Sequence, residues 1–267
     1  MLFGALALGL IVGSFANVVI HRLPLHESVV WPNSRCPRCR AWIRWFDNIP
    51  LLSFLLLRGR CRDCRAPISW RYPIVEALTG LVFVQNVAAF GLSLRAAAGI
   101  VLGTMLLIVF FIDLDHFIIP NRITYPGVLI GLGFTLAGAS PLSGLSYVST
   151  ASGWRAAAAA ALTAAALGAV FVLINVLSAR LLGEEGMGLG DAKLAAMIGA
   201  FLGWPIGAVA ILLGVFVGGV IGLGLLALRI RGRREHIPFG PALAAGAFLA
   251  MWWGSALLHW YVSRLTV

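Results

Sequence analysis

Long apolar stretches, separated by polar connections, make up most of the 267-residue chain. The apolar residues within each stretch are continuous and do not alternate with polar ones, which predicts helices and not strands. A helix needs about 20 apolar residues to cross a bilayer, so the segment 192–203 is short for a span. We predict eight apolar segments, over residues 2–20, 74–91, 96–112, 124–139, 156–182, 192–203, 206–228 and 242–258.

The composition places these segments in a membrane. Hydrophobic residues make up 60% of the chain and charged residues 11%, whereas a soluble domain carries about 25% charged residues. A soluble protein of this size could not hide so much apolar surface in one core. The sequence therefore predicts an all-α integral membrane protein with about eight transmembrane helices. We divide it into a first transmembrane helix (1–20), a polar loop domain (21–73) and a multi-span membrane domain (74–267).

The basic residues indicate which side of the membrane each loop faces. The chain carries 20 Lys and Arg against 10 Asp and Glu, for a net charge of +10. If the 21–73 loop is cytoplasmic, only Arg95, Arg155 and Arg264 fall on the outer face, and such a bias is typical of membrane proteins. The basic segments contain no motif that reads nucleic acid. We therefore expect the lipid bilayer, and no nucleic acid, as a partner.

All four cysteines lie in the polar loop, as two Cys-x-x-Cys pairs: Cys36 with Cys39, and Cys61 with Cys64. Two such pairs can supply four thiolates to one tetrahedral Zn²⁺, and thiols stay reduced in the cytoplasm. Because four thiolates leave no position for water, we predict a structural zinc site rather than a catalytic one. Two disulfides, or four thiols without a ligand, are the alternatives.

Two aspartates lie at the predicted cytoplasmic ends of apolar segments, where ionisable residues are costly and often functional. Asp113 ends the third segment, and Asp191 opens the short sixth segment after Gly188 and Gly190. Two carboxyl groups that meet in a low-dielectric site tend to share one proton, and this is the chemistry of aspartic proteolysis. We expect the two glycines to let the backbone approach an extended peptide and to permit a positive φ before Asp191.

Simpler roles are open for the same acids. Asp191 could cap a helix that begins at Ala192, and Asp113 and Asp115 could be interfacial residues at a helix end. Asp113 and Asp115 are two positions apart, so on a helix they point about 200° away from each other. Only one of them can face Asp191, and the residues themselves do not decide which.

The order of several motifs resembles that of the type IV prepilin peptidases, bacterial enzymes that combine leader peptidase and N-methyltransferase activities. The matching segments cover almost the whole chain and include both Cys-x-x-Cys pairs. The other segments are Gly13-Ser14-Phe15-Ala16-Asn17-Val18, His21-Arg22-Leu23-Pro24, Asp47-Asn48-Ile49-Pro50, Arg71-Tyr72-Pro73-Ile74-Val75-Glu76, Ile119-Pro120-Asn121, Gly188-Leu189-Gly190-Asp191 and Ile237-Pro238-Phe239-Gly240-Pro241. Each motif alone is modest, but their order and spacing together are specific.

The resemblance implies an aspartic endopeptidase of the bacterial inner membrane, with eight spans and an active site that faces the cytoplasm. It assigns the first catalytic acid to Asp113, upstream of Pro120, and the second to Asp191. It also implies cleavage of prepilins or pseudopilins after a Gly that ends a short basic leader, and methylation of the new N-terminus with S-adenosylmethionine. Asn121 departs from the family, because many members carry Asp there. No segment has a Rossmann-type fingerprint, so the methyl-donor site stays unassigned.

The connection before Asp191 carries two further acids, Glu184 and Glu185. We predict that they attract the Lys and Arg residues of a substrate leader, with a solvated acidic turn as the alternative.

Two other functions compete with a prepilin peptidase. A presenilin-like intramembrane protease of other substrates shares the Gly-x-Gly-Asp motif but lacks the four-Cys loop. A non-enzymatic zinc-loop transporter or scaffold would use Asp113 and Asp191 in an ion path. Such a path needs ionisable steps across the membrane, whereas the outer half of every predicted span lacks acids.

Overall fold

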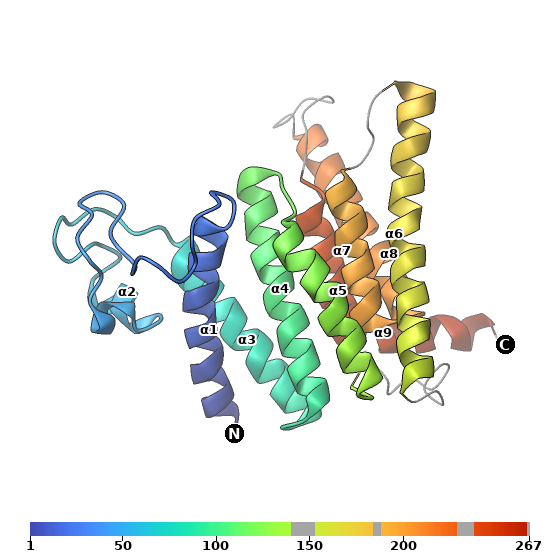
Figure 1. The fold of residues 1–267 in the computed structure, drawn as a ribbon, viewed down its shortest axis with the longest axis horizontal. Coiled ribbons are helices and arrows are strands. Elements are labelled where there is room, and N and C mark those ends of the chain that lie inside the picture. Colours follow the sequence, from blue (N-terminus) through green and yellow to red (C-terminus); the bar gives the residue numbers. More distant parts are fainter. Residues whose placement is uncertain (140–152, 184–187, 229–237, 266–267) are drawn as a thin grey trace. The chain divides into compact units, whose positions relative to one another are not determined.

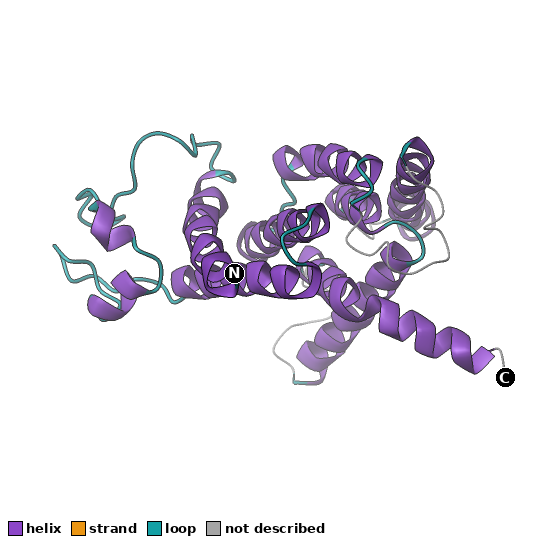
Figure 2. Ribbon diagram, turned by 90° about the horizontal axis from the view of Figure 1, so that it is seen from below, coloured by secondary structure: helices purple, strands orange, loops and turns teal. Residues whose placement is uncertain are grey.

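The computed structural model describes residues 1–139, 153–183, 188–228 and 238–265. Over these ranges the regular elements are helices, and β structure is limited to two isolated bridges (Figures 1 and 2). The prediction of an all-α protein is therefore confirmed. The elements are α1 (Leu2–Arg22), η1 (Trp45–Asn48), α2 (Leu52–Leu56), α3 (Arg71–Phe90), α4 (Leu94–His116), α5 (Asn121–Leu136), α6 (Trp154–Leu182), α7 (Leu189–Leu202), α8 (Ile206–Ala227) and α9 (Gly240–Leu265).

The eight predicted apolar segments each correspond to one helix. Six helices in the described ranges, α1, α3, α4, α6, α8 and α9, are long and apolar enough to cross a membrane. The other two are shorter: α5 has 16 residues and α7 has 14. The start of α5 was placed too late, because Pro120 is extended and the helix begins directly after it, at Asn121. Eight spans is thus an approximate description of six long helices and two short ones.

The chain divides into two compact units, Met1–Ile108 and Val109–Val267, with the boundary inside α4. In the first unit α1 packs along α3. Glycines make this contact close: a Cβ at Gly9 would lie 2.8 Å from the Cα of Gly80, and a Cβ at Gly13 would lie 2.7 Å from the Cα of Glu76. Small residues at helix crossings are typical of membrane helices, because they let two backbones approach.

In the second unit the short helix α7 packs against α5, α6, α8 and α9, and Figure 1 shows it between α5 and α6. Its side chains are buried on nearly every side, among them those of Leu194, Met197 and Phe201. A helix that is apolar all round is covered by protein rather than by solvent. With 1.5 Å per residue, α7 is roughly 21 Å long, which is less than the ~30 Å thickness of the hydrocarbon core.

Candidate active site and metal centre

Asp113 and Asp191 both lie in the second unit, at the ends of two helices. Asp113 is in the last turn of α4 and is 5% exposed, while Asp191 is in the first turn of α7 and is 8% exposed. The two carboxyl groups are near enough for their charges to interact. The structure thus brings the two carboxyl groups into one region, and their role as a catalytic pair stays a prediction.

Asp115, the alternative partner for Asp191, is exposed, whereas Asp113 is buried. The capping role for Asp191 is also wrong as proposed, because α7 begins at Leu189 and its N-cap is Gly188. Asp191 instead occupies the first turn, with its backbone N–H donating to the Gly188 carbonyl over 3.0 Å. Of the acids at these helix ends, Asp113 and Asp191 are therefore the pair that the fold encloses.

Gly188 and Gly190 do not use positive φ, and this part of the prediction was wrong. Gly188 has φ −72° and Gly190 lies inside the helix, because α7 begins one residue earlier. Gly190 provides space instead: a Cβ there would lie 3.0 Å from the Cβ of Ile119. That distance is tighter than ordinary contact, so a glycine at this position lets the α4–α5 connection pass close to Asp191.

Gly240 is a residue near the dyad to which sequence reasoning gave no role. Its backbone N–H, at the start of α9, donates to Oδ2 of Asp113 over 3.0 Å in a buried contact. The surrounding Pro-Phe-Gly-Pro motif was recognised in the sequence, but nothing local connects it with an aspartate 127 positions away.

A second contact ties α7 to the start of α5. The Nζ of Lys193 donates to Oδ1 of Asn121 over 2.8 Å and lies 5.6 Å from the centre of the Tyr125 ring. Lys193 is the only lysine of the chain and follows Asp191 by two positions. The contact therefore fixes the segment that contains Ile119 against the helix that carries Asp191.

Replacing Asn121 by Asp is expected to strengthen this contact, because a carboxylate accepts a charge-assisted hydrogen bond from the ammonium group. Asn121 is exposed, so the gain in unfolding free energy should be only about 0.2–1 kcal/mol. Asn121→Ala removes the acceptor and should be less stable than the wild type. Thermal unfolding of the three purified proteins measures the order, and an Asp variant no more stable than the Ala variant would contradict it.

The four cysteines come together in the first unit. Their Sγ atoms all lie within 4.8 Å of one another, and the Sγ atoms of Cys36 and Cys64 are 3.8 Å apart. Zn–S bonds of about 2.3 Å in a tetrahedron give an S···S separation of about 3.8 Å. All four are free thiols rather than two disulfides. The cluster could therefore hold a metal ion.

The two Cys-x-x-Cys pairs fold as two copies of one turn. The N–H of Cys36 donates to the Ala41 carbonyl over 2.9 Å, and the N–H of Cys61 donates to the Ala66 carbonyl over 2.8 Å. The residue after the second cysteine has positive φ in both turns, +59° at Arg40 and +58° at Arg65. The backbone N–H of Cys39, directed at the Cys36 sulfur, is the main influence that lowers the pKa of Cys36 to about 7.

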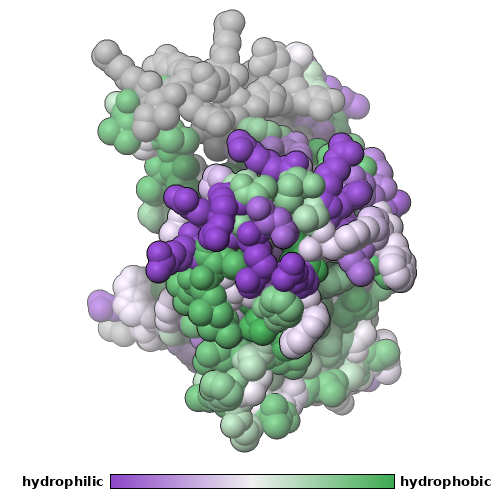
Figure 3. Space-filling view, turned by 90° about the vertical axis from the view of Figure 1, so that its left-hand side faces the viewer, coloured by the Kyte–Doolittle hydropathy of each residue, from purple (hydrophilic) through white to green (hydrophobic). Residues whose placement is uncertain are grey.

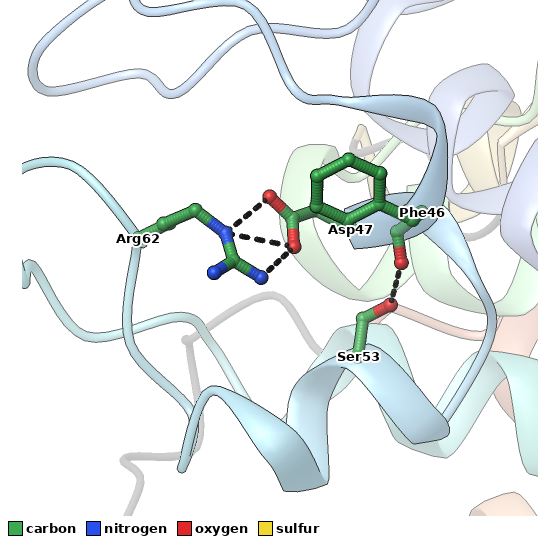
Figure 4. Close-up of polar contacts among 4 residues, drawn as sticks. All are labelled: Phe46, Asp47, Ser53 and Arg62. Carbon is green, nitrogen blue, oxygen red and sulfur yellow. Dashed lines mark hydrogen bonds and ion pairs between the residues drawn. The ribbon is translucent and has the colours of Figure 1, made fainter.

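An ion pair connects the segment between the two turns with the second turn (Figure 4). The guanidinium of Arg62 donates to both carboxylate oxygens of Asp47, with its Nε 2.8 Å from Oδ2. This hydrogen bond holds the pKa of Asp47 below its usual range. The hydroxyl of Ser53 donates to the Phe46 carbonyl over 2.9 Å, and this bond connects α2 with the residue next to Asp47.

Arginines cover the outside of the loop. On the face seen in Figure 3, hydrophilic side chains gather over the loop segment. Its exposed arginines are Arg35, Arg38, Arg40, Arg44, Arg58, Arg60, Arg62 and Arg65. This positive surface would offset part of the negative charge that a metal centre with four thiolates would carry.

Two of the sequence motifs, and the residue that follows a third, make contacts near a buried glutamate in the first unit. Glu76, on α3, is 8% exposed, and its Oε2 accepts the backbone N–H of Leu51 over 2.9 Å. Between α1 and α3, the side-chain amide of Asn17 donates to the Tyr72 carbonyl over 3.0 Å. Sequence reasoning matched these motifs to the family but missed that they form one contact region. The region fastens the four-Cys loop to α3.

Glu184 and Glu185, the predicted leader-binding acids, lie outside the described residues.

Two carboxyl groups that share a buried site are the arrangement of aspartic peptidases, and ionisable residues in membrane helices are often functional. Residues 7–90 match the bacterial peptidase A24 N-terminal domain, and residues 100–223 match the type IV leader peptidase family. The chain belongs to the type IV leader peptidase family, and it is a multi-pass membrane protein.

Several relatives are named prepilin leader peptidase/N-methyltransferase. The chain is 38% identical to that of Aeromonas hydrophila over 279 residues, which covers 96% of this chain and 91% of the relative. It is 42% identical to that of Myxococcus xanthus, covering 92% of this chain and 70% of the relative. It is 37% identical to that of Pseudomonas aeruginosa, covering 96% and 91%. No solved structure matches. The resemblance inferred from the motifs is therefore confirmed.

Proposed function

We propose that this protein is a prepilin leader peptidase that also N-methylates its product. The observation that carries the proposal is the buried pair Asp113 and Asp191 in a chain of the type IV leader peptidase family. The substrate is a prepilin or pseudopilin, cut after the Gly that ends its basic leader. We infer that the protein lies in the bacterial inner membrane with its active site toward the cytoplasm, since that orientation puts the basic loop inside.

The two aspartates divide the work of hydrolysis. The ionised carboxylate takes a proton from a water molecule, whose oxygen then attacks the scissile carbonyl carbon. The protonated carboxyl donates to the carbonyl oxygen as the tetrahedral intermediate forms. When that intermediate collapses, the C–N bond breaks and the leaving amine takes the proton that the first carboxyl group took from water. The hydroxyl on the former carbonyl carbon returns its proton to the second carboxylate as the C=O bond re-forms, so both groups return to their starting states. The scissile bond meets these groups at the membrane boundary because both helices end there.

The N-methylation half of the proposal rests on family membership. S-adenosylmethionine would supply the methyl group, and the new N-terminal amine would be its acceptor. Within the described ranges the Gly-rich segment before α7 follows a helix and not a strand, so it does not fit a dinucleotide-type cofactor loop. The residues that would bind the methyl donor are therefore not assigned.

We further propose that the four-Cys cluster holds one structural Zn²⁺, with Cys36, Cys39, Cys61 and Cys64 as its ligands. The thiol separations fit a tetrahedral zinc site, and four thiolates fill its coordination. The 21–73 segment would then be a zinc-binding loop domain, and 74–267 the catalytic membrane domain.

The experiment that tests the function uses the purified protein with a prepilin in detergent, with and without S-adenosylmethionine. Mass spectrometry of the product should find the leader removed after Gly in both reactions, and one added methyl group on the new N-terminus only with the methyl donor. Cleavage without methylation would remove the second activity. An intact prepilin would overturn the proposal.

Substrate binding gives a further expectation. Replacing Glu184 and Glu185 together by Gln should raise KM several-fold with little change in kcat, because exposed ion pairs contribute only ~0.2–1 kcal/mol each. The difference should shrink at high salt, since ions screen the attraction in the wild type. Glu27→Gln, an exposed acid in the four-Cys loop, is the control. An unchanged KM at low salt would mean that the pair is only a polar turn.

A further inference from the structure

The start of α9 is held in a defined place beside the dyad. Phe239, the residue before the helix, has its ring centre 6.2 Å from that of Phe171 on α6. Gly218 of α8 also leaves this ring room, since a Cβ there would lie 2.9 Å from its Cε2. Pro241 suits the first turn of a helix and has no N–H of its own. The N–H of Gly240 is thus presented from a fixed position.

Gly240 touches the carboxyl group of Asp113 in two ways. Its N–H donates to Oδ2 over 3.0 Å, and a Cβ at the same residue would lie 2.6 Å from that oxygen. Gly240 does not have positive φ. Space beside the carboxyl, and not backbone conformation, therefore favours a glycine here, because a Cβ would push the Asp113 carboxyl away from its place.

The side chain of Ile119 connects this contact with the other half of the dyad. Its Cδ1 would lie 3.2 Å from a Cβ at Gly240 and 3.4 Å from a Cβ at Gly190. Ile119 therefore packs against two glycines: Gly240, which is hydrogen-bonded to Asp113, and Gly190, which directly precedes Asp191. A shift of Gly240 would displace Asp113 relative to Asp191.

We propose that Gly240 is a positioning residue of the dyad, which holds Oδ2 of Asp113 through its N–H and leaves Oδ1 for proton exchange. The inference rests on the proposed peptidase function and adds to it a backbone group from a third helix. A carboxyl group fixed at one oxygen loses rotational freedom, so its second oxygen keeps one orientation toward water and substrate.

Two variants test the proposal. Gly240→Ala places a methyl group against the carboxyl and should lower kcat roughly 10²-fold with KM unchanged, since small misplacements of reacting groups have effects of that size. The matched control is Gly254→Ala, on the same helix. A Cβ there would meet Ile206 at 3.2 Å, away from the aspartates, and should leave kcat unchanged.

The second variant removes the donor without adding volume. Cell-free synthesis with glycolic acid at position 240 replaces the N–H by an ester oxygen, and kcat should fall roughly tenfold or more with KM unchanged. If Gly240→Ala does not fold, this variant decides alone. Wild-type kcat in the ester variant, or a loss confined to KM, would overturn the inference. Failure of the wild type itself to cleave prepilin would instead overturn the proposed function.

Discussion

Replacing either Asp113 or Asp191 by Asn is expected to abolish prepilin cleavage, with a loss of roughly 10⁴-fold or more in kcat. An amide is nearly the same size as a carboxyl group, but it can neither take a proton from water nor supply one as an acid. The variants should insert and fold as the wild type does. Gel-based cleavage of a prepilin by the purified proteins measures the effect.

Asp115→Asn is the matched control, because Asp115 lies two residues from Asp113 on the same helix end but is exposed. It should cleave at the wild-type rate. Full activity of Asp113→Asn, with loss in Asp115→Asn, would move the catalytic role to Asp115. Full activity of all three variants would remove aspartic chemistry from this site.

Removal of the metal is expected to unfold the four-Cys loop. Cys61→Ser should reduce bound zinc from one ion per chain to none and open the loop to proteases. Structural zinc sites supply apparent folding free energies of about 10–16 kcal/mol, and this loop has few buried aliphatic side chains to replace that amount. Elemental analysis and limited proteolysis provide the two measurements.

Arg38→Ser is the control for the metal site, because Arg38 lies between Cys36 and Cys39 but contributes no thiol. It should keep its zinc and its protease resistance. A wild-type protein without zinc and with two disulfides by mass would contradict the prediction. We expect Asp113 and Asp191 to need no metal themselves, so a chelator should open the loop before it reduces cleavage.

The helices were predictable from the sequence because burial in a bilayer requires long continuous apolar runs. Each predicted segment corresponds to a helix, and the short length of α7 was visible in advance. The start of α5 was missed, since the apolar pattern begins at Ile123-Thr124 while the backbone becomes helical directly after Pro120. Helix ends depend on such local backbone geometry, which the apolar pattern does not record.

The candidate site was predictable only in part. Acids at the ends of apolar segments and paired cysteines are local signals, and both pointed to the residues that the fold brings together. The contacts that orient them are not local: Gly240 meets Asp113 across 127 positions, and Leu51 meets Glu76 across 25. Every residue except proline has the same backbone N–H, so the sequence does not show which N–H will donate to a given carboxylate. The positive φ expected at Gly188 and Gly190 failed for a related reason, because it depended on where α7 begins.

The enclosure of α7 has a consequence for adaptation to different lipids. Bilayers differ in thickness by several ångströms, and spanning helices respond by tilting or by distorting the lipid around them. In the second unit those adjustments act first on longer helices such as α6 and α8, whose outer faces carry the exposed leucines Leu162, Leu173, Leu212 and Leu223. The helix that carries Asp191 contacts neighbouring helices, and its length is less than the thickness of the hydrocarbon core. We therefore expect changes in membrane thickness, with temperature or lipid composition, to act on the outer helices of this unit, while the helix that carries Asp191 keeps its surroundings.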